Sequence, residues 1–342
     1  MTNLAALPDD SDADLTAEAI ARCQLANGFI TWFREGHGDP WNHVEAAMAL
    51  DAMGCGEDAV RAYDWCVDQQ RADGSFFAFY GPDGFVEQQH VDNNATAYVA
   101  TGVLHHVLST GDLDEAHRLW PTVERAIGFV LGHQVPTGAV TWSVDANGKP
   151  GGFALVASSS AIAISLGAAA RLADLVGVGG GRYRSALDRL IGALSRGGEL
   201  FEPKDEFAMD WYYPVLAGVF PNDEAARRMT AGAERFLTAD GVLCRSDRRW
   251  VTTAETAECA MALSRVNRHD EARAVLDTTI DKRCDDGSYL TGLVYPERSQ
   301  FPPGEVTSYS AAAVLLAEDL LRGGTATSAL FGEVVSDHFE LG

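Results

Sequence analysis

The sequence contains little positive charge. Its 342 residues include 26 Lys and Arg against 49 Asp and Glu, which gives a formal net charge of −23. A chain this acidic repels nucleic acid and anionic membrane surfaces, and no cluster of basic residues makes a local exception. We therefore expect neither nucleic acid nor a membrane as a partner. The simplest role of the charge is solubility.

The sequence also lacks a secretory signal, a long apolar run and paired cysteine motifs. Its start, MTNLAALPDDSDADLTAEA, is acidic and has no basic segment followed by an apolar one. The stretch LVASSSAIAISLGAAARL is interrupted by serines and is typical of a buried helix of small residues. Six cysteines show no CxxC pair and no His at zinc-ligand spacing. We expect a cytoplasmic protein with reduced cysteines, no metal site and no cofactor.

A short phrase recurs along the chain: the end of a helical pattern, a polar turn, then Gly and a few apolar residues. Its glycines are separated by 46, 64, 60, 43 and 46 residues, and they are Gly28, Gly74, Gly138, Gly198, Gly241 and Gly287. Internal periods of this size indicate repeated supersecondary units. Two helical patterns lie between most successive phrases, so each unit is predicted to be a helical hairpin.

The two helices of each predicted pair differ in character. One is apolar nearly all round after its first turn, as in residues 41–53, and the other is amphipathic, as in residues 57–69. The first kind belongs in an inner ring and the second on the outside. We predict an all-α fold, an (α/α)6 toroid of helical hairpins. A single barrel domain is expected over residues 21–322, between an acidic N-terminal tail at 1–20 and a C-terminal tail at 323–342 that could complete the ring.

The N-terminal turns of the inner helices should meet at one end of the toroid, which we call the mouth. Each of these turns carries a carboxylate, an amide or a hydroxyl group. Such residues are also preferred helix N-caps, and capping accounts for Asp39 and Thr252. Capping does not account for the aromatic residues beside them, which are Trp41, Trp211, Tyr212, Trp250 and Tyr309.

Aromatic rings mixed with polar groups in a concave mouth are suited to sugars, because flat rings stack on pyranose faces while polar groups bind hydroxyls. The pattern therefore predicts a small-molecule or oligosaccharide ligand. The expected substrate-binding residues are Trp41, His43, Asp92, Asn94, Trp211, Tyr212, Trp250, Glu258 and Tyr309.

Residues 69–142 resemble the six-hairpin glycosidase superfamily of (α/α)6 barrels. The resemblance includes a QxxDGSF segment, the Pro82-Asp83-Gly84 turn, a Thr110-Gly111-Asp112 turn and a helix with Trp120-Pro121. Glu305 before Ser308-Tyr309-Ser310 is similar to the start of the last glucoamylase-like repeat. The resemblance implies a carbohydrate-active enzyme, most simply a glycoside hydrolase.

A second resemblance competes with the first. Gln69 with Asp73-Gly74-Ser75-Phe76 is similar to the repeat of terpenoid cyclases and protein prenyltransferase β subunits, which use a related toroid. The sequence departs from that pattern, because it has no DxDD, no DDxxD and no set matching the prenyltransferase zinc ligands. An acidic protein is also a poor receptor for a diphosphate.

Glycoside hydrolysis needs one carboxylic acid to protonate the leaving oxygen and one carboxylate to activate water or attack the anomeric carbon. We predict Glu255 as general acid, because neighbouring aromatics would raise the pKa of a carboxyl in that first turn. Glu305 is the predicted general base, with Asp210 as a further catalytic candidate. Glu258 lies one turn beyond Glu255, either deeper in the site or paired with Arg245 or Arg265.

Two other functions remain open on the sequence alone. Sugar epimerases share this barrel and use pairs of His, for which His43, His90, His105 and His106 are available. A glycan-binding toroid without catalysis would need the aromatics but no matched pair of acids. The sequence indicates neither the sugar, nor the linkage, nor the oligomeric state.

Overall fold

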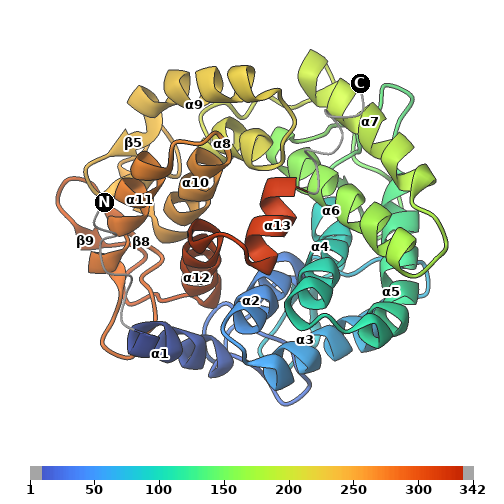
Figure 1. The fold of residues 1–342 in the computed structure, drawn as a ribbon, viewed down its shortest axis with the longest axis horizontal. Helices are drawn as coiled ribbons and strands as arrows, with labels where there is room; N and C mark the ends of the chain where they lie inside the picture. Colours follow the sequence, from blue (N-terminus) through green and yellow to red (C-terminus); the bar gives the residue numbers. More distant parts are fainter. Residues whose placement is uncertain (1–9, 334–342) are drawn as a thin grey trace.

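The computed structural model describes residues 10–333, which form a closed ring of helices (Figure 1). Each inner helix packs on the next one, and the last packs on the first. The inner helices are α2 (Pro40–Ala52), α4 (Asn93–Thr110), α6 (Val156–Leu175), α8 (Ala208–Leu216), α10 (Thr253–Arg265) and α12 (Ser308–Arg322). The predicted all-α toroid is confirmed.

An outer helix backs each member of the inner ring. The outer helices are α1 (Asp10–Ala21), α3 (Gly56–Gln69), α5 (Leu113–Leu131), α7 (Gly181–Arg196), α9 (Asn222–Phe236) and α11 (His269–Asp277). Helix α6 is the one described helix long and apolar enough to cross a membrane, yet 83% of its apolar window is buried in the ring. Burial on all sides explains why the inner helices are apolar, and the solvated backs of the outer helices explain their charge.

The two ends of the chain differ from the sequence prediction. Helix α1 lies inside the segment predicted as an acidic tail, and it packs on α12 and α2. Its Ala13, Ala17 and Ile20 are buried on one face, which outweighs the acidic composition. Helix α1 therefore closes the outer ring, the place considered for the C-terminal tail. Residues 1–9 and 334–342, which belong to the two predicted tails, lie outside the described residues.

Helix α13 (Ala326–Glu333) lies across the middle of the ring instead of joining its outer layer (Figure 1). It contacts α4 and α12. His105, near the end of α4, bonds through Nε2 to the hydroxyl of Thr327 at 2.9 Å. Helix α13 thus covers the end of the barrel where the inner helices finish, and the opposite end is the mouth.

The repeated glycine phrase joins each outer helix to the next inner one. At Gly74, φ is +92° and a Cβ atom would lie 2.3 Å from the carbonyl oxygen of Arg125. Only glycine permits both this backbone conformation and this approach. Gln70 Nε2 donates to the carbonyls of Gly74 (3.0 Å) and Thr122 (2.8 Å), tying the turn to α5. The same arrangement recurs at Gly28 and Gly138.

Short strands lie in the connections at the mouth end of the ring. In the first half these are the pairs β1 (Phe79–Tyr80) with β2 (Val86–Gln88), and β3 (Val91–Asp92) with β4 (Ser143–Val144). In the second half one antiparallel sheet contains five strands: β5 (Leu237–Thr238), β6 (Gly241–Leu243), β7 (Trp250–Thr252), β8 (Gly292–Val294) and β9 (Ser299–Gln300). Its central strand β7 pairs Thr252 with Val242 of β6 and Val251 with Leu293 of β8, and it leads directly into α10. The 3-10 turn η1 (Ile280–Lys282) follows α11.

Candidate active site

Asp39 caps α2 at the mouth, as the sequence predicts. Its Oδ1 accepts the backbone N–H groups of Trp41 (2.8 Å) and Asn42 (3.1 Å). Its Oδ2 accepts from the indole of Trp32 (2.7 Å) and the side-chain amide of Asn42 (2.6 Å). Burial raises the pKa of Asp39, and these hydrogen bonds oppose that rise. Thr252 stands at the start of α10, but its side chain makes no capping bond.

Glu45 lies nearly two turns beyond Asp39 in the same helix and is 7% exposed. Its Oε1 accepts from Trp41 Nε1 at 2.8 Å and from the hydroxyl of Tyr98 at 3.1 Å. Tyr98 in turn accepts a hydrogen bond from Tyr213. Burial, reinforced by the negative charges of Asp39 and Glu255, raises the pKa of Glu45 to about 7. This carboxyl therefore carries a proton for part of the time near neutral pH.

Helix α10 supplies two further carboxylates. Glu258 is 8% exposed and accepts a hydrogen bond from the hydroxyl of Tyr212. Burial, with the charges of Glu45 and Glu255, raises the pKa of Glu258. Glu255, one turn nearer the surface, is half-buried and forms a hydrogen bond with the thiol of Cys244. The partner of Glu258 is thus a tyrosine on α8, in place of the arginine considered from the sequence.

Tyr309, at the start of α12, faces the same group of acids. Burial raises the pKa of its hydroxyl, and so do the charges of Glu255, Glu305 and Asp39. Its ring meets Trp32 edge to face, with centroids 5.4 Å apart. Glu305 stands on the loop before α12, where its Oε1 accepts from the hydroxyl of Thr291 at 2.8 Å. Tyr309 therefore lies among the carboxylates of three separate segments.

We call Asp39, Glu45, Glu255 and Glu258, together with the aromatic residues that bond to them or pack beside them, the mouth cluster. Its aromatic residues are Trp32, Trp41, Tyr98, Tyr212, Tyr213 and Tyr309. Within residues 10–333, no Lys, Arg or His forms a hydrogen bond or ion pair with these four carboxylates. Their partners are indole N–H, phenol O–H, amide and thiol groups. Carboxyl groups without a paired cation suit proton donation when they are protonated, and when they are ionised they stabilise a ligand that develops positive charge.

Some predicted site residues lie at the edge of this cluster. Asp92 ends β3, within 3.5 Å of His90, and burial raises its pKa to about 6. Asn94 is buried in the first turn of α4, where its side-chain oxygen has no hydrogen-bond partner within residues 10–333. Trp250 lies on β7 and donates from Nε1 to the carbonyl of Phe301 at 3.0 Å. These three border the mouth.

Other predicted residues point elsewhere. His43 is fully buried; its Nδ1 accepts from Ile30 N–H at 3.0 Å and its Nε2 donates to the Ala62 carbonyl at 2.9 Å. Both ring nitrogens are therefore occupied by backbone, and burial lowers the pKa of His43 to about 4.

Asp210 and Trp211 line a separate cavity behind α8. The structure thus brings Glu255, Glu258, Trp41, Tyr212 and Tyr309 together, while His43, Asp210 and Trp211 stand apart.

Sequence reasoning missed several members of the site. Tyr98 lies four residues after Asn94 and could have been found, because that spacing places both on one face of α4. Tyr213 follows Tyr212 but faces Trp41, with ring centroids 5.7 Å apart. Trp32 and Cys244 lie on connections, where no periodicity indicates the direction of a side chain.

The histidine pair expected of an epimerase does not form at the mouth. His105 and His106 lie near the end of α4 that α13 covers, and His43 is sealed in the core. His90 borders the mouth on its own. Among residues 10–333, no group of three or more His, Cys, Asp or Glu side chains is arranged to hold a metal ion.

Comparison with known proteins supports a glycosidase. No family model matches the chain. The MMP endo-(1,4)-3-O-methyl-α-D-mannosidase of Mycolicibacterium hassiacum is 40% identical over 320 residues, which cover 92% of this chain and 88% of that protein. A wild-type glycosidase structure aligns with a TM-score of 0.70 at 17% identity, covering 91% of this chain and 97% of its own. The cellobiose 2-epimerase of Spirochaeta thermophila aligns with a TM-score of 0.66 at 14% identity, covering 91% and 96%.

The two structural likenesses show the shared fold. Together with the mannosidase relative, they confirm the resemblance to six-hairpin glycosidases. The resemblance to terpenoid cyclases and prenyltransferases is unconfirmed. The sequence identity to the mannosidase extends over nearly the full length of both proteins. The chain belongs to the family of this mannosidase and is a glycosidase-like hydrolase.

Proposed function

We propose that the protein is an endo-acting mannosidase that cuts (1,4) links within chains of 3-O-methyl-α-D-mannose, as the name of the Mycolicibacterium hassiacum relative states for that protein. The observation that carries the proposal is the mouth cluster, in which buried acids face aromatic rings without a neutralising cation. The cluster lies at the N-terminal turns of the inner ring, where acids of α2 and α10 meet aromatic rings of α2, α4 and α8.

The composition of the mouth suits a methylated sugar. A 3-O-methyl group removes one hydroxyl donor and adds an apolar contact. Half-buried Trp32, Trp41 and Tyr309 offer apolar ring surface beside the acids. Aromatic contact compensates for a lost hydrogen bond, whereas a purely polar site would leave a group unpaired.

The proposed chemistry uses Glu255 as proton donor to the leaving oxygen. Glu305 serves as the carboxylate that activates water, since Thr291 fixes one of its oxygens and the side chain is half-exposed. Asp39, held by four N–H donors, stabilises in its ionised form the positive charge that develops on the sugar ring. Glu45 lies beneath them and carries a proton for part of the time near neutral pH, which limits the repulsion among the acids.

A direct test compares two oligosaccharides of equal length and (1,4) linkage, one built of 3-O-methyl-α-D-mannose and one of unmethylated α-D-mannose. The wild-type protein should release internal fragments from the first, seen as several product masses at early times. Its kcat/KM should be at least about 10-fold lower for the unmethylated chain, the usual effect of one apolar contact. Release of single terminal units only, or cleavage of neither chain, would refute the proposal.

The cytoplasmic location and the absence of nucleic-acid and membrane partners remain predictions. Six free cysteines support a reducing compartment, and the net charge of −23 supports the lack of polyanionic partners. Fractionation of cells that express the tagged protein checks the location.

A further inference from the structure

A cavity opens behind α8, on the side of that helix away from the mouth cluster. Its volume is about 390 Å³, within the roughly 300–1,000 Å³ usual for small-molecule pockets. Helices α8 and α9 and the loop of residues 201–205 form its walls, with Val156 at the start of α6. The side chains that matter for its chemistry are Phe201, Asp210, Trp211, Arg228, Arg235 and Phe236.

The cavity has a rigid polar wall. Asp210 is 8% exposed, and its Oδ1 accepts from the backbone N–H of Ala157 at 3.2 Å. No other side-chain hydrogen bond of Asp210 occurs within residues 10–333, so Oδ2 is available to a ligand. Arg228 is fixed by bonds from Nε to the Trp211 carbonyl (2.9 Å) and from a terminal nitrogen to the Asp210 carbonyl (2.5 Å).

Its apolar wall is equally well defined. The rings of Trp211 and Phe236 stack with centroids 5.4 Å apart and planes inclined by 12°. Gly232 of α9 makes room for them, because a Cβ atom there would lie 2.3 Å from Trp211 Nε1. The indole N–H is held by the Arg228 carbonyl at 2.8 Å. The two walls together present aromatic carbon on one side and a carboxylate beside a guanidinium on the other.

The charges around the cavity are balanced. Three basic side chains face three acidic ones; these are Lys204, Arg228 and Arg235 against Glu202, Asp205 and Asp210. A balanced lining gives no net attraction for an anion or a cation. It offers donors, acceptors and an aromatic wall at once, which suits a neutral polyhydroxylated ligand.

We propose that this cavity is a distal saccharide subsite, which binds an outer unit of the glycan chain while inner units occupy the mouth cluster. The proposal rests on the proposed endo-mannosidase function. Asp210 lines the cavity while Tyr212, two residues later on α8, bonds to Glu258 in the mouth. The two sites are therefore separated by about one helix diameter, roughly 10 Å, and share one wall.

This arrangement predicts a dependence on chain length. A short oligosaccharide reaches only the mouth cluster, whereas a longer one also gains the contacts behind α8. The value of kcat/KM should therefore rise with length in the wild-type protein, because the remote contacts are retained in the transition state.

The test fills the cavity from exposed positions. Ala231 of α9 is exposed and lines the cavity, so Ala231→Trp should occupy it without disturbing the core. Glu202→Trp fills it from the loop opposite. Glu234→Trp is the matched control, since Glu234 is exposed on the same helix and does not line the cavity. Both filling variants should lower kcat/KM for the longest methylated oligosaccharide about 10-fold or more and leave the shortest cleaved one unchanged.

An unchanged length dependence in both filling variants overturns the subsite, and so does an equal loss in the Glu234→Trp control. Calorimetric titration of the same oligosaccharides separates this outcome from failure of the proposed function. If the wild-type protein cleaves nothing, the endo-mannosidase function fails. The subsite then stands only if Ala231→Trp weakens binding of the long chain relative to the short one, and it fails if neither chain binds.

Discussion

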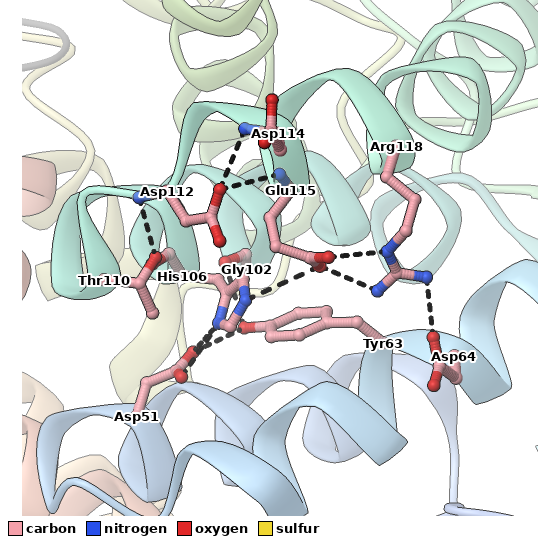
Figure 2. Close-up of polar contacts among 10 residues, drawn as sticks. All are labelled: Asp51, Tyr63, Asp64, Gly102, His106, Thr110, Asp112, Asp114, Glu115 and Arg118. Atoms are coloured by element: carbon pink, nitrogen blue, oxygen red, sulfur yellow. Dashed lines mark hydrogen bonds and ion pairs between the residues drawn. The ribbon is translucent and has the colours of Figure 1, made fainter.

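The two ends of the barrel both bury carboxylates, but they handle them in opposite ways. At the end away from the mouth, Asp51 of α2 lies against His106 of α4, with Nδ1 2.9 and 3.0 Å from the two carboxylate oxygens (Figure 2). Glu115 lies 3.9 Å beyond the other ring nitrogen, and Arg118 pairs with Glu115 at 2.7 Å. At the mouth, the acids have only neutral donors.

We call Asp51, Tyr63, His106, Glu115 and Arg118, with Asp64 at its solvent end, the rear network; its residues come from helices α2, α3, α4 and α5. Tyr63 of α3 donates to the Gly102 carbonyl of α4 at 2.9 Å and reaches Asp51 at 3.4 Å. Burial raises the pKa of Asp51, and the hydrogen bond and charge of His106 oppose that rise. Acids that serve the fold are thus placed beside groups able to carry positive charge. Acids left without one cost stability, and such sites are typical of catalysis.

The largest expected effect concerns Glu255. Glu255→Gln is nearly isosteric, and turnover of the methylated oligosaccharide should fall about 10²- to 10⁴-fold, because a placed proton donor contributes that much. Glu305→Gln should cause a loss of similar size. The melting temperature should hardly change, since a first-turn acid contributes only about 0.3–1 kcal/mol through the helix dipole.

Steady-state rates with the two Gln variants and Asp39→Asn separate the roles. Full activity in the Glu255→Gln variant would show that Glu255 is not the general acid. Full activity in Glu305→Gln with loss in Asp39→Asn would transfer the role of base to Asp39.

The rear network should show the reverse behaviour. His106→Gln removes the imidazole that contacts both oxygens of buried Asp51, and removing one partner of a buried pair costs about 3–5 kcal/mol. Urea unfolding should detect that loss, while turnover per folded molecule stays near the wild-type value. The double variant Asp51→Asn/His106→Gln should lose less free energy of unfolding than the sum of the losses in the two single variants. Additive losses in the double variant would show that the two side chains are not coupled.

The sequence predicts the ring and the mouth end better than the directions of the side chains. The glycine period and the contrast between apolar and amphipathic helices give the toroid directly. Inner helices are buried on every face, so their periodicity cannot distinguish a polar residue facing the axis from one facing a neighbour. His43 and Glu45 are two residues apart, yet one is sealed by backbone bonds and the other joins the mouth cluster. Trp211 turns toward α9 because Gly232 leaves space there, which the sequence of α8 does not reveal.

The short strands in the connections between helices are also not predicted from the sequence. The five-stranded sheet is built from strands of only two or three residues, too short for alternation to be visible. Trp250 lies on β7 and not in the first turn of α10, where the sequence places it, and its bond to Phe301 depends on a pairing distant in sequence. Long-range partners of this kind are not encoded in any local pattern.

A third, smaller effect concerns the pH dependence of stability at the mouth. The folded protein holds the Glu45 proton more tightly than the unfolded chain, because its pKa rises from 4.5 to about 7. The contribution of Glu45 to stability is therefore complete below pH 4.5 and is lost as the pH rises through 7. Glu45→Gln does not titrate, so its stability relative to wild type should increase from pH 4.5 to 8, by up to about 3 kcal/mol. Melting curves across that range check this; a constant difference would mean that Glu45 titrates normally.

The smallest expected effect lies at the solvent end of the rear network. Asp64 is paired with Arg118 at 2.7 Å, but their side chains are 49% and 38% exposed. Water and salt screen such a pair, so Asp64→Ala should cost only about 0.2–1 kcal/mol, and the cost should fall further in about 1 M NaCl. Urea unfolding at low and high salt measures both values. His106→Gln serves as the comparison, because its loss arises from a buried pair and should persist in high salt. An Asp64 effect as large and as salt-resistant as that of His106 would mean that the network acts as one buried unit out to its surface, and burial would no longer explain the contrast between the two ends of the barrel.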